Sequence, residues 1–299
     1  MKFHQDEQSE AEANGPDTGP GFGGLLRTLF SKMPWGEQVT HEECLTVPCP
    51  AGHAVKIYNA NGKTRVLGED RDDIEIRVCK SVHADCEDVA TKLLDSIRIQ
   101  RSATTEVLDI EVQIPRKCSR HAVAHIELLV PHQTQITLTS TNGKICLEGL
   151  ESAIRAHSNN GPVLIRRVMG DIDVTTANAK VKCNDTQGHL RARSSNGKIE
   201  VDCHQGSLDA STSNGVIRAS IDELDQIGVS LTTSNGRIVL DLPETTNADV
   251  DILVDNGHIR NDLELIDQTR DTDGRVRGRI GSGGTPIRLR TSNGTVSLR

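Results

Sequence analysis

The stretch RARSSNGKIEV, residues 191–201, has near-copies on both sides of it, and this repeat decides the fold. ASTSNGVIRAS follows at 210–220, LTTSNGRIVLD at 231–241 and LRTSNGTVSLR at 289–299. The asparagine of the turn recurs at Asn142, Asn160, Asn178, Asn196, Asn214, Asn235, Asn256 and Asn293, with Asp273 in the same place between the last two. The interval is 18 residues over the first five copies and 17–21 residues afterwards. A period of this size, kept over many copies, is typical of a solenoid.

Most copies carry apolar residues at four positions: six and four residues before the asparagine, and three and five residues after it. On either side of the turn the two apolar positions are two residues apart, which is the spacing of one buried face of a β-strand. Each copy is therefore predicted to be a coil of two short strands, called here the first and the second arm, joined at Asn-Gly. In a stack, each arm would pair with its copies about 4.8 Å above and below.

The turn itself has a predicted structural role. Both Asn and Gly tolerate positive φ, which is expected to favour them at a tight bend. The stacked asparagines are expected to hydrogen bond along the axis as a ladder of Asn142, Asn160, Asn178, Asn196, Asn214, Asn235, Asn256 and Asn293. A Ser or Thr two residues before most of them is expected to satisfy backbone groups at the bend.

Three parts follow from this pattern. Residues 1–40 are predicted to be disordered and then to form a short amphipathic segment, 21–36, that caps the fold or touches a membrane surface or a partner. Residues 41–140 are predicted to be irregular first coils with a helix inserted at 84–100, and residues 141–299 to be the regular Asn-Gly repeat. The predicted fold class is all-β, a single-stranded β-solenoid with coils of about 18–21 residues. Its last coil, 287–299, is expected to lie exposed at the end of the stack.

The composition limits the function classes. Aromatic residues make up only 2% of the 299 residues, which predicts a thin interior without large aromatic filler. The formal charge of −8 argues against specific nucleic-acid binding. Eight cysteines without a recognisable secretion signal are interpreted as thiols, so the cytoplasm is predicted, with the cell envelope or surface as the alternative.

Known solenoid chemistries do not fit the repeat. Hexapeptide-repeat acyltransferases place one aliphatic residue every six residues at three corners, whereas the apolar residues here come in pairs on two faces. The glycine-rich stretch GSGGT, 281–285, lacks the carboxylates that a calcium-binding β-roll needs. The spacing of His, Cys and Ser indicates no catalytic constellation. The sequence therefore predicts no enzyme, no catalytic residue, no metal and no cofactor.

Basic residues recur at outward positions two and four residues after the asparagine or aspartate of the turn. They predict a basic stripe, interpreted first as a solvated face whose like charges keep strand edges from aggregating. The alternative is a surface that contacts an acidic polymer, an anionic membrane surface or a polyanionic cell-envelope component. The stripe consists of Lys144, Lys180, Lys182, Lys198, Arg218, Arg237, Arg260, Arg275 and Arg277.

The tandem T-S-N-G-x-I-x-V units, preceded by V-x-I-x-N-x-N-G-x-x-x-V-x-G at 55–68, resemble the bacterial putative-adhesin family of β-strand repeats. The resemblance covers roughly residues 50–299 and implies the architecture without implying catalytic residues. Our hypothesis is a non-enzymatic, adhesin-like scaffold that presents repetitive strand faces to an unidentified protein or acidic polymer. The alternative hypothesis is a polymer formed by end-to-end stacking and self-association, in the manner of bactofilins.

Overall fold

The structure is a computed structural model that describes residues 37–115 and 121–299. Apart from one helix, α2 (Glu87–Asp95), the regular structure of these residues is β. The strands are β1 (Glu37–Pro48), β2 (Ala54–Asn61), β3 (Thr64–Glu69), β4 (Asp73–Ala84), β5 (Arg98–Ala103), β6 (Val107–Gln113), β7 (Ala122–Pro131), β8 (Gln135–Asn142), β9 (Ile145–Glu148), β10 (Ile154–Ser158), β11 (Val163–Met169), β12 (Ile172–Thr176), β13 (Val181–Ser194), β14 (Ile199–Asn214), β15 (Ile217–Asp241), β16 (Ala248–Asn261), β17 (Ile266–Arg270), β18 (Arg275–Ile280) and β19 (Thr285–Leu298). The predicted amphipathic segment 21–36 lies outside the described residues.

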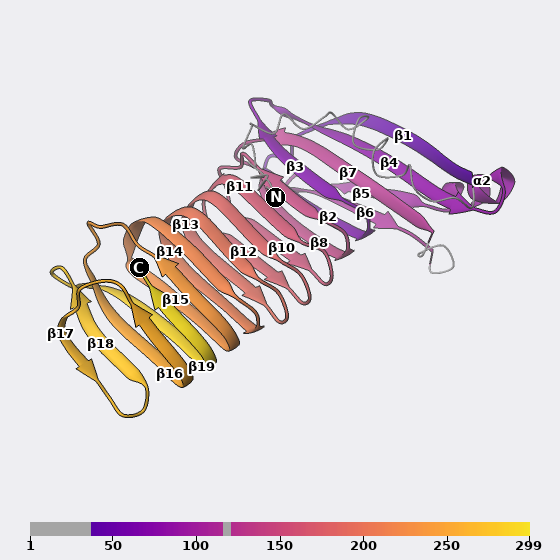
Figure 1. The fold of residues 1–299 in the computed structure, drawn as a ribbon. Coiled ribbons are helices and arrows are strands. Elements are labelled where there is room, and N and C mark those ends of the chain that lie inside the picture. The colour runs from indigo at the N-terminus through magenta and orange to yellow at the C-terminus, as the bar shows by residue number, and fades with distance from the viewer. Residues whose placement is uncertain (1–36, 116–120) are drawn as a thin grey trace, which may run out of the picture. The chain divides into compact units, whose positions relative to one another are not determined.

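The first arms of the coils form one row of parallel strands. β2, β8, β10 and β12 lie side by side and are followed by the second halves of β13, β14 and β15 (Figure 1). Ile154 pairs with Ile136 on one side and with Ile172 on the other. The same position of successive copies therefore lies at the same place in successive coils, as the repeat predicts.

The second arms form another parallel row. β3, β9 and β11 are followed by the first halves of β13, β14 and β15, and Val163 lies between Ile145 and Val181. β13, β14 and β15 are long because each runs from the second arm of one coil into the first arm of the next. Over the described residues the sheet stays open.

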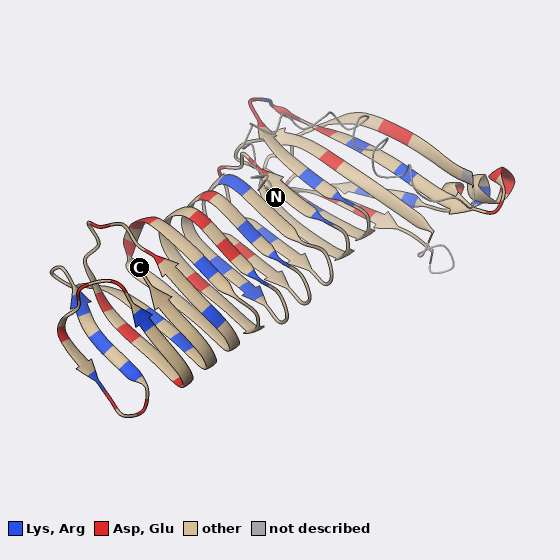
Figure 2. Cartoon of the chain, viewed as in Figure 1, with Lys and Arg blue, Asp and Glu red and all other residues tan. Residues whose placement is uncertain are grey.

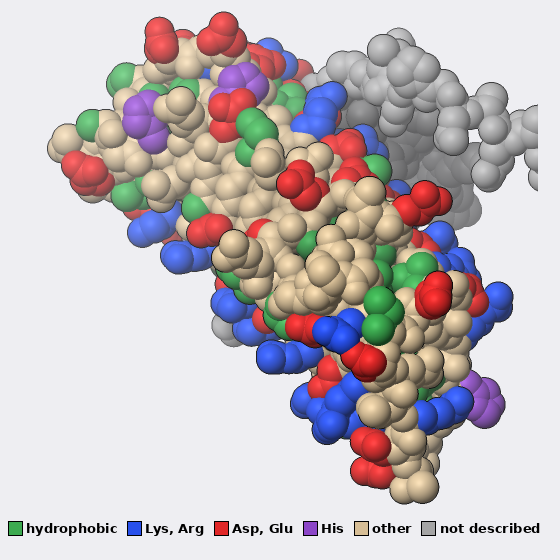
Figure 3. Space-filling model, turned by 90° about the vertical axis from the view of Figure 1, so that its left-hand side faces the viewer, with side chains coloured by type: hydrophobic (Ala, Val, Ile, Leu, Met, Phe, Trp, Pro, Cys, Tyr) green, Lys and Arg blue, Asp and Glu red, His purple; other side chains and the backbone are tan. Residues whose placement is uncertain are grey.

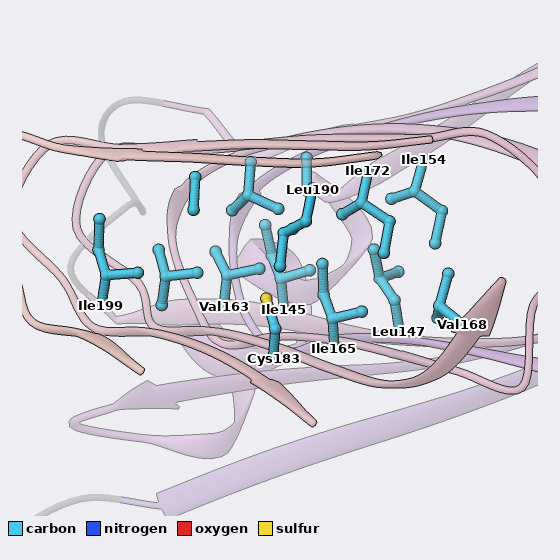
Figure 4. Close-up of a cluster of buried hydrophobic side chains, with 14 of the residues drawn as sticks. Ile145, Leu147, Ile154, Val163, Ile165, Val168, Ile172, Cys183, Leu190 and Ile199 are labelled. Atoms are coloured by element: carbon cyan, nitrogen blue, oxygen red, sulfur yellow. The ribbon is translucent and has the colours of Figure 1, made fainter. Parts of the chain in front are cut away.

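The core lies between the two rows. In Figure 4, Ile154, Ile172 and Leu190 extend from one layer towards Ile165 and Cys183 of the other. All five side chains are fully buried or nearly so, at 0–2% exposure. The two layers are close enough for branched aliphatic residues to fill the space, which explains why the chain needs few aromatic residues.

At the N-terminal end of the stack, spatial order departs from chain order. β2 lies between β6 and β8, and β3 lies between β7 and β9. The outermost coil is thus formed by β6 and β7, which come later in the chain than β2 and β3. Antiparallel strands extend it: β5 pairs with β6, β4 with β7, and β1 with β4.

The helix is shorter than the sequence predicts. α2 ends at Asp95, and residues 98–100 of the predicted helix already belong to β5. Ser96 closes the helix by donating its Oγ hydrogen to the carbonyl oxygen of Leu93 at 2.5 Å. Arg98 then pairs with Gln113 of β6, so sheet pairing takes over directly after the turn.

At the C-terminal end, two expectations are wrong. The last coil is not at the end of the stack, because β19 lies between β15 and β16 and pairs in parallel with both. The turn at Asp273 does not begin another stacked coil, because β18 runs antiparallel to β16 and β17 runs antiparallel to β18. A hairpin therefore occupies the place where the repeat predicts a regular coil (Figure 1).

Candidate functional site

The turn asparagines form a continuous row of side-chain hydrogen bonds. The amide Nδ2 of Asn160 donates to Oδ1 of Asn142 at 2.9 Å, and that of Asn178 donates to Oδ1 of Asn160 at 3.0 Å. The row continues through Asn196, Asn214 and Asn235 at 2.9–3.0 Å. It then passes to Asn293 at 2.9 Å and ends at Asn256 at 3.2 Å, following the spatial order of the coils. These bonds hold eight successive turns in register.

The glycine after the asparagine is required for a different reason from the one the sequence suggests. Among the glycines that follow a turn asparagine, only Gly62, Gly257 and Gly294 have a positive φ. At Gly161 a Cβ atom would lie 1.7 Å from the carbonyl oxygen of Gly143, the same position in the preceding coil. The coils approach too closely here for a side chain, so close stacking and not the backbone angle selects glycine at most turns.

Hydroxyl groups two residues before the asparagine bind the backbone of the turn. Ser158 Oγ donates to the carbonyl oxygen of Gly161 at 2.8 Å, and Thr212 Oγ1 donates to that of Gly197 at 3.2 Å. In β2 the same position is taken by Asn59, whose Nδ2 donates to the carbonyl oxygen of Ala124 at 2.9 Å. The buried carbonyl groups of the corner therefore find partners.

The predicted basic residues do not form one stripe. Most of them belong to the second arms, but Arg275 and Arg277 lie on β18, which pairs with the first arm of β16. Figures 2 and 3 show Lys and Arg interspersed with Asp and Glu over the coils. Seven of the nine predicted residues have a carboxylate partner: Lys180 and Lys198 with Glu200, Lys182 with Asp202, Arg218 with Asp241, Arg260 with Asp262, and Arg275 and Arg277 with Asp251. Within residues 37–115 and 121–299, Lys144 and Arg237 have none at salt-bridge distance.

Two of these carboxylates are strongly held by their partners. Burial of Glu200 opposes its ionisation, but hydrogen bonds from Lys180 and Lys198 outweigh this effect, and the pKa of Glu200 lies below its usual value. The two-pronged contact of Arg275 with Asp251, at 2.7 and 2.6 Å, likewise lowers the pKa of Asp251. Most of the predicted stripe is thus neutralised within the protein.

A groove of about 400 Å³ runs along the opposite corner, where each second arm returns to the next first arm. The turn repeat did not indicate this groove. Arg167, Asp185 and Cys203 stand at equivalent positions of successive coils there, and all three have positive φ, at 49°, 53° and 54°. Its lining residues are His132, Gly149, Glu151, Arg167, Met169, Asp185, Thr186, Gln187, Cys203, Gln205 and Asp222. The 18-residue spacing of Gly170, Gly188 and Gly206, each with positive φ, is the sequence signal that could have located this corner.

Several of the described thiols are poor nucleophiles. Burial raises the pKa of Cys183 to about 12 and that of Cys79 to about 11, so both stay protonated. In the groove, burial and then the charges of Asp222 and Asp185 raise the pKa of Cys203. The seven cysteines in the described part of the chain are free thiols.

The histidines that contact hydroxyl groups are built into the packing. His204 is fully buried, and its two ring nitrogens lie 3.0 Å from Thr186 Oγ1 and from the carbonyl oxygen of Ser207. His189 Nδ1 lies 2.7 Å from Ser207 Oγ, but Ser207 is only 1% exposed. Among the described residues, no group of three or more His, Cys, Asp or Glu side chains could hold a metal ion.

Comparison with known families shows to which protein family the chain is related. The family described as Toastrack DUF4097 matches residues 54–299, which begin with β2 and include all of the stacked coils. The chain belongs to the Toastrack DUF4097 family. The resemblance to the adhesin-like β-strand repeats is thereby confirmed, and the match leaves β1 outside the Toastrack domain.

Several solved structures resemble this Toastrack chain. A putative cell adhesion protein from Clostridium sporogenes shares 10% identity over 87% of this chain and 99% of its own, with a TM-score of 0.33. A putative adhesin from Parabacteroides distasonis shares 10% sequence identity over 88% of this chain and 98% of its own, with a TM-score of 0.42. A putative adhesin from Bacteroides fragilis shares 13% sequence identity over 88% of this chain and 97% of its own, with a TM-score of 0.39. No curated protein matches the sequence.

The helical content of the described Toastrack chain is small. α2 has nine residues, and none of the helices in the described ranges is long and apolar enough to cross a membrane.

Proposed function

We propose that this Toastrack domain is a non-enzymatic, adhesin-like scaffold: a β-solenoid with coils of about 18–21 residues that presents repetitive strand faces to a partner. The observation that carries the proposal is the row of hydrogen-bonded asparagines from Asn142 to Asn256, which holds eight turns in register. Outward side chains therefore recur at intervals of about 4.8 Å on a rigid support. Such a surface suits many weak, equally spaced contacts with an extended partner.

The chemistry of the described residues supports a binding role. The pKa values of the Cys79, Cys183 and Cys203 thiols are raised, which disfavours the nucleophilic thiolate. Ser207, which lies beside His189, is only 1% exposed, and within the described residues no carboxylate is placed against the pair to complete a catalytic triad. We infer that the partner is a protein or an acidic polymer of the cell envelope, which Lys144 and Arg237, unpaired within the described residues, would contact.

The structure removes the observation that motivated the hypothesis of an end-to-end polymer. The hypothesis was motivated by an exposed coil at 287–299 at the end of the stack, whereas β19 is enclosed between β15 and β16.

Protease treatment of intact native cells tests the adhesin-like role, because a protein that contacts other surfaces must be reachable from outside. The full chain would be followed with an antibody, beside a cytoplasmic and a surface-exposed marker protein. Degradation in step with the surface marker is the expected result. Protection in step with the cytoplasmic marker would agree with the compartment that the sequence predicts, and it would replace adhesion by an intracellular scaffold.

A further inference from the structure

Glu200 shows which group fits between two stacked lysines. Lys180 and Lys198 stand two residues after Asn178 and Asn196, so they occupy the same outward position in adjacent coils. Glu200 lies two residues beyond Lys198 and binds both ammonium groups with its two carboxylate oxygens. One carboxylate thus neutralises a pair of like charges on neighbouring strands.

The same pair of lysines recurs nearer the N-terminal end, but without the carboxylate. Lys63 and Lys144 stand two residues after Asn61 and Asn142, whose strands are in register. The strands that follow are also paired, and the N–H of Thr64 donates to the carbonyl oxygen of Lys144 at 2.9 Å. The position that corresponds to Glu200 is occupied by Cys146.

The cations around Cys146 differ in whether they have partners. Arg65 binds Glu127 at 3.1 Å and Glu148 at 3.7 Å. Lys63, Lys144 and Arg166 have no carboxylate at salt-bridge distance in the part of the chain that the structure describes. Lys144 is exposed, and Lys63 and Cys146 are partly exposed, so solvent or a ligand can reach them.

Cys146 does not replace the missing carboxylate. Burial raises the pKa of its thiol, although Lys144 and Lys63 act in the opposite direction. The thiol therefore stays neutral at neutral pH, and the two lysines face each other about one strand spacing apart without a counter-charge. Like charges on directly neighbouring strands destabilise a sheet, and an anion bound from outside would relieve this repulsion.

We propose that Lys63 and Lys144 bind a glutamate or aspartate carboxylate of an acidic polypeptide in the place that Glu200 takes in its own coil. This inference rests on the proposed function, because it names the part of the strand face that meets the partner and the chemistry that it meets. A polypeptide carboxylate is favoured since a glutamate side chain is the group that this geometry accepts elsewhere in the chain.

Binding of the full chain to immobilised poly-L-glutamate tests the site. The double variant Lys63→Gln/Lys144→Gln is expected to weaken binding about tenfold or more, because charge-assisted contacts are lost. The matched control, Lys180→Gln/Lys198→Gln, removes the same number of charges from lysines that Glu200 already occupies, and it should change binding by less than about twofold. Equal losses in the two double variants would mean that net charge alone drives binding, which would overturn the proposal.

A second variant places a carboxylate of the protein itself between Lys63 and Lys144. Cys146→Glu is expected to abolish poly-L-glutamate binding and to raise Tm by about 1–3 °C, because an internal carboxylate relieves the lysine pair. The Lys63→Gln/Lys144→Gln variant should raise Tm as well, which provides a check if the glutamate does not pack. Unchanged or lower Tm in both variants, together with retained binding to Cys146→Glu, would contradict the inference.

A separate experiment tests which kind of polyanion binds. Dextran sulfate or a polyuronate that binds wild type while poly-L-glutamate does not would overturn the assignment to a polypeptide. These results are independent of the protease experiment. If the protein is protected from protease in intact cells but binds poly-L-glutamate through Lys63 and Lys144, the carboxylate site stands and the adhesin-like role is lost. If the protein is accessible to protease but does not bind poly-L-glutamate, the adhesin-like role stands and the carboxylate site is lost.

Discussion

The side-chain amide of Asn196 donates to Asn178 and accepts a hydrogen bond from Asn214, so both of its polar groups are used by neighbouring coils. The side chains are exposed, and water competes for each of these bonds. The row therefore contributes less through the energy of any single bond than through the register that it imposes on the turns. Residue-scale chemistry here sets the alignment of the whole stack.

Asn196→Ala should lower the free energy of unfolding by about 1–2 kcal/mol, because two neighbouring amides lose a partner and each net bond contributes roughly 0.5–1.5 kcal/mol. Urea unfolding followed by circular dichroism measures this. Asn256→Ala, at the end of the row, removes only one such bond and serves as the control. An equal or larger loss at Asn256 would show that the row is not what couples the turns.

Gly236→Ala should cost about 1–3 kcal/mol through overpacking. The added Cβ would lie 1.8 Å from the carbonyl oxygen of Gly215, and relief requires the two coils to move apart. The natural Ala179 stands at this position after Asn178, so Ala179→Gly is the matched reverse change and should not destabilise. If thermal unfolding shows that Gly236→Ala is neutral, close stacking is not the reason for the glycine.

At the scale of the element, β14 carries a polar interruption in an apolar row. His204 pairs in register with Thr186 of β13, and Thr186 in turn pairs with Val168 of β11 in the preceding coil. Burial lowers the pKa of His204 below its ordinary value of 6.5. The hydrogen bonds with Ser207 and Thr186 act in the opposite direction and raise the pKa, but burial outweighs them because protonation would place a charge in the core.

This arrangement predicts a pH dependence. Since the folded-state pKa is depressed, the unfolded chain binds the proton more readily, so stability is fully present above about pH 6.5 and is lost as pH falls towards the folded-state value. The double variant Thr186→Val/His204→Val, which continues the apolar row of Val168, should reduce the loss of Tm between pH 7 and pH 5. Burial also lowers the pKa of His125, so some dependence should persist. An unchanged slope would rule out His204 as a source.

At the scale of the whole molecule, the ends of the stack are closed by strands that return. β2 and β3 come first among the coils in the chain but lie second in the stack, and β19 comes last but lies inside β16. Both ends then continue into antiparallel strands. Outer coils that pair antiparallel differ from the inner coils, and this difference hinders uncontrolled growth by parallel stacking.

The inserted position of β19 predicts an unusual response to truncation. Removing residues 285–299 should separate β15 from β16 and destabilise the fold more than removing 242–299, although the second deletion is longer. The longer deletion leaves β15 as a complete edge coil. Limited proteolysis and thermal unfolding of the two truncated chains compare them directly. Greater stability of the chain lacking only 285–299 would contradict the observed strand order.

The sequence by itself determined the coil. Residues at period two must share a face of a strand, so the burial of Ile154, Ile172 and Leu190 and the row of turn asparagines could be predicted from spacing alone. The inserted helix could also be placed, although not its end, because sheet pairing with β6 overrides the helical pattern after Ser96.

Only the tertiary structure decided the order of the coils and the balance of charge between them. Every coil presents the same backbone edge, so β19 can pair with β15 and β16 equally well, and no local pattern distinguishes the two outcomes. Ile259 follows the repeat and is still only partly buried, because its coil lies at the edge. Likewise, the difference between Lys198 beside Glu200 and Lys144 beside Cys146 appears only once neighbouring strands are known. Periodicity defines which way a side chain points, whereas its partners depend on which strand comes to lie next to it.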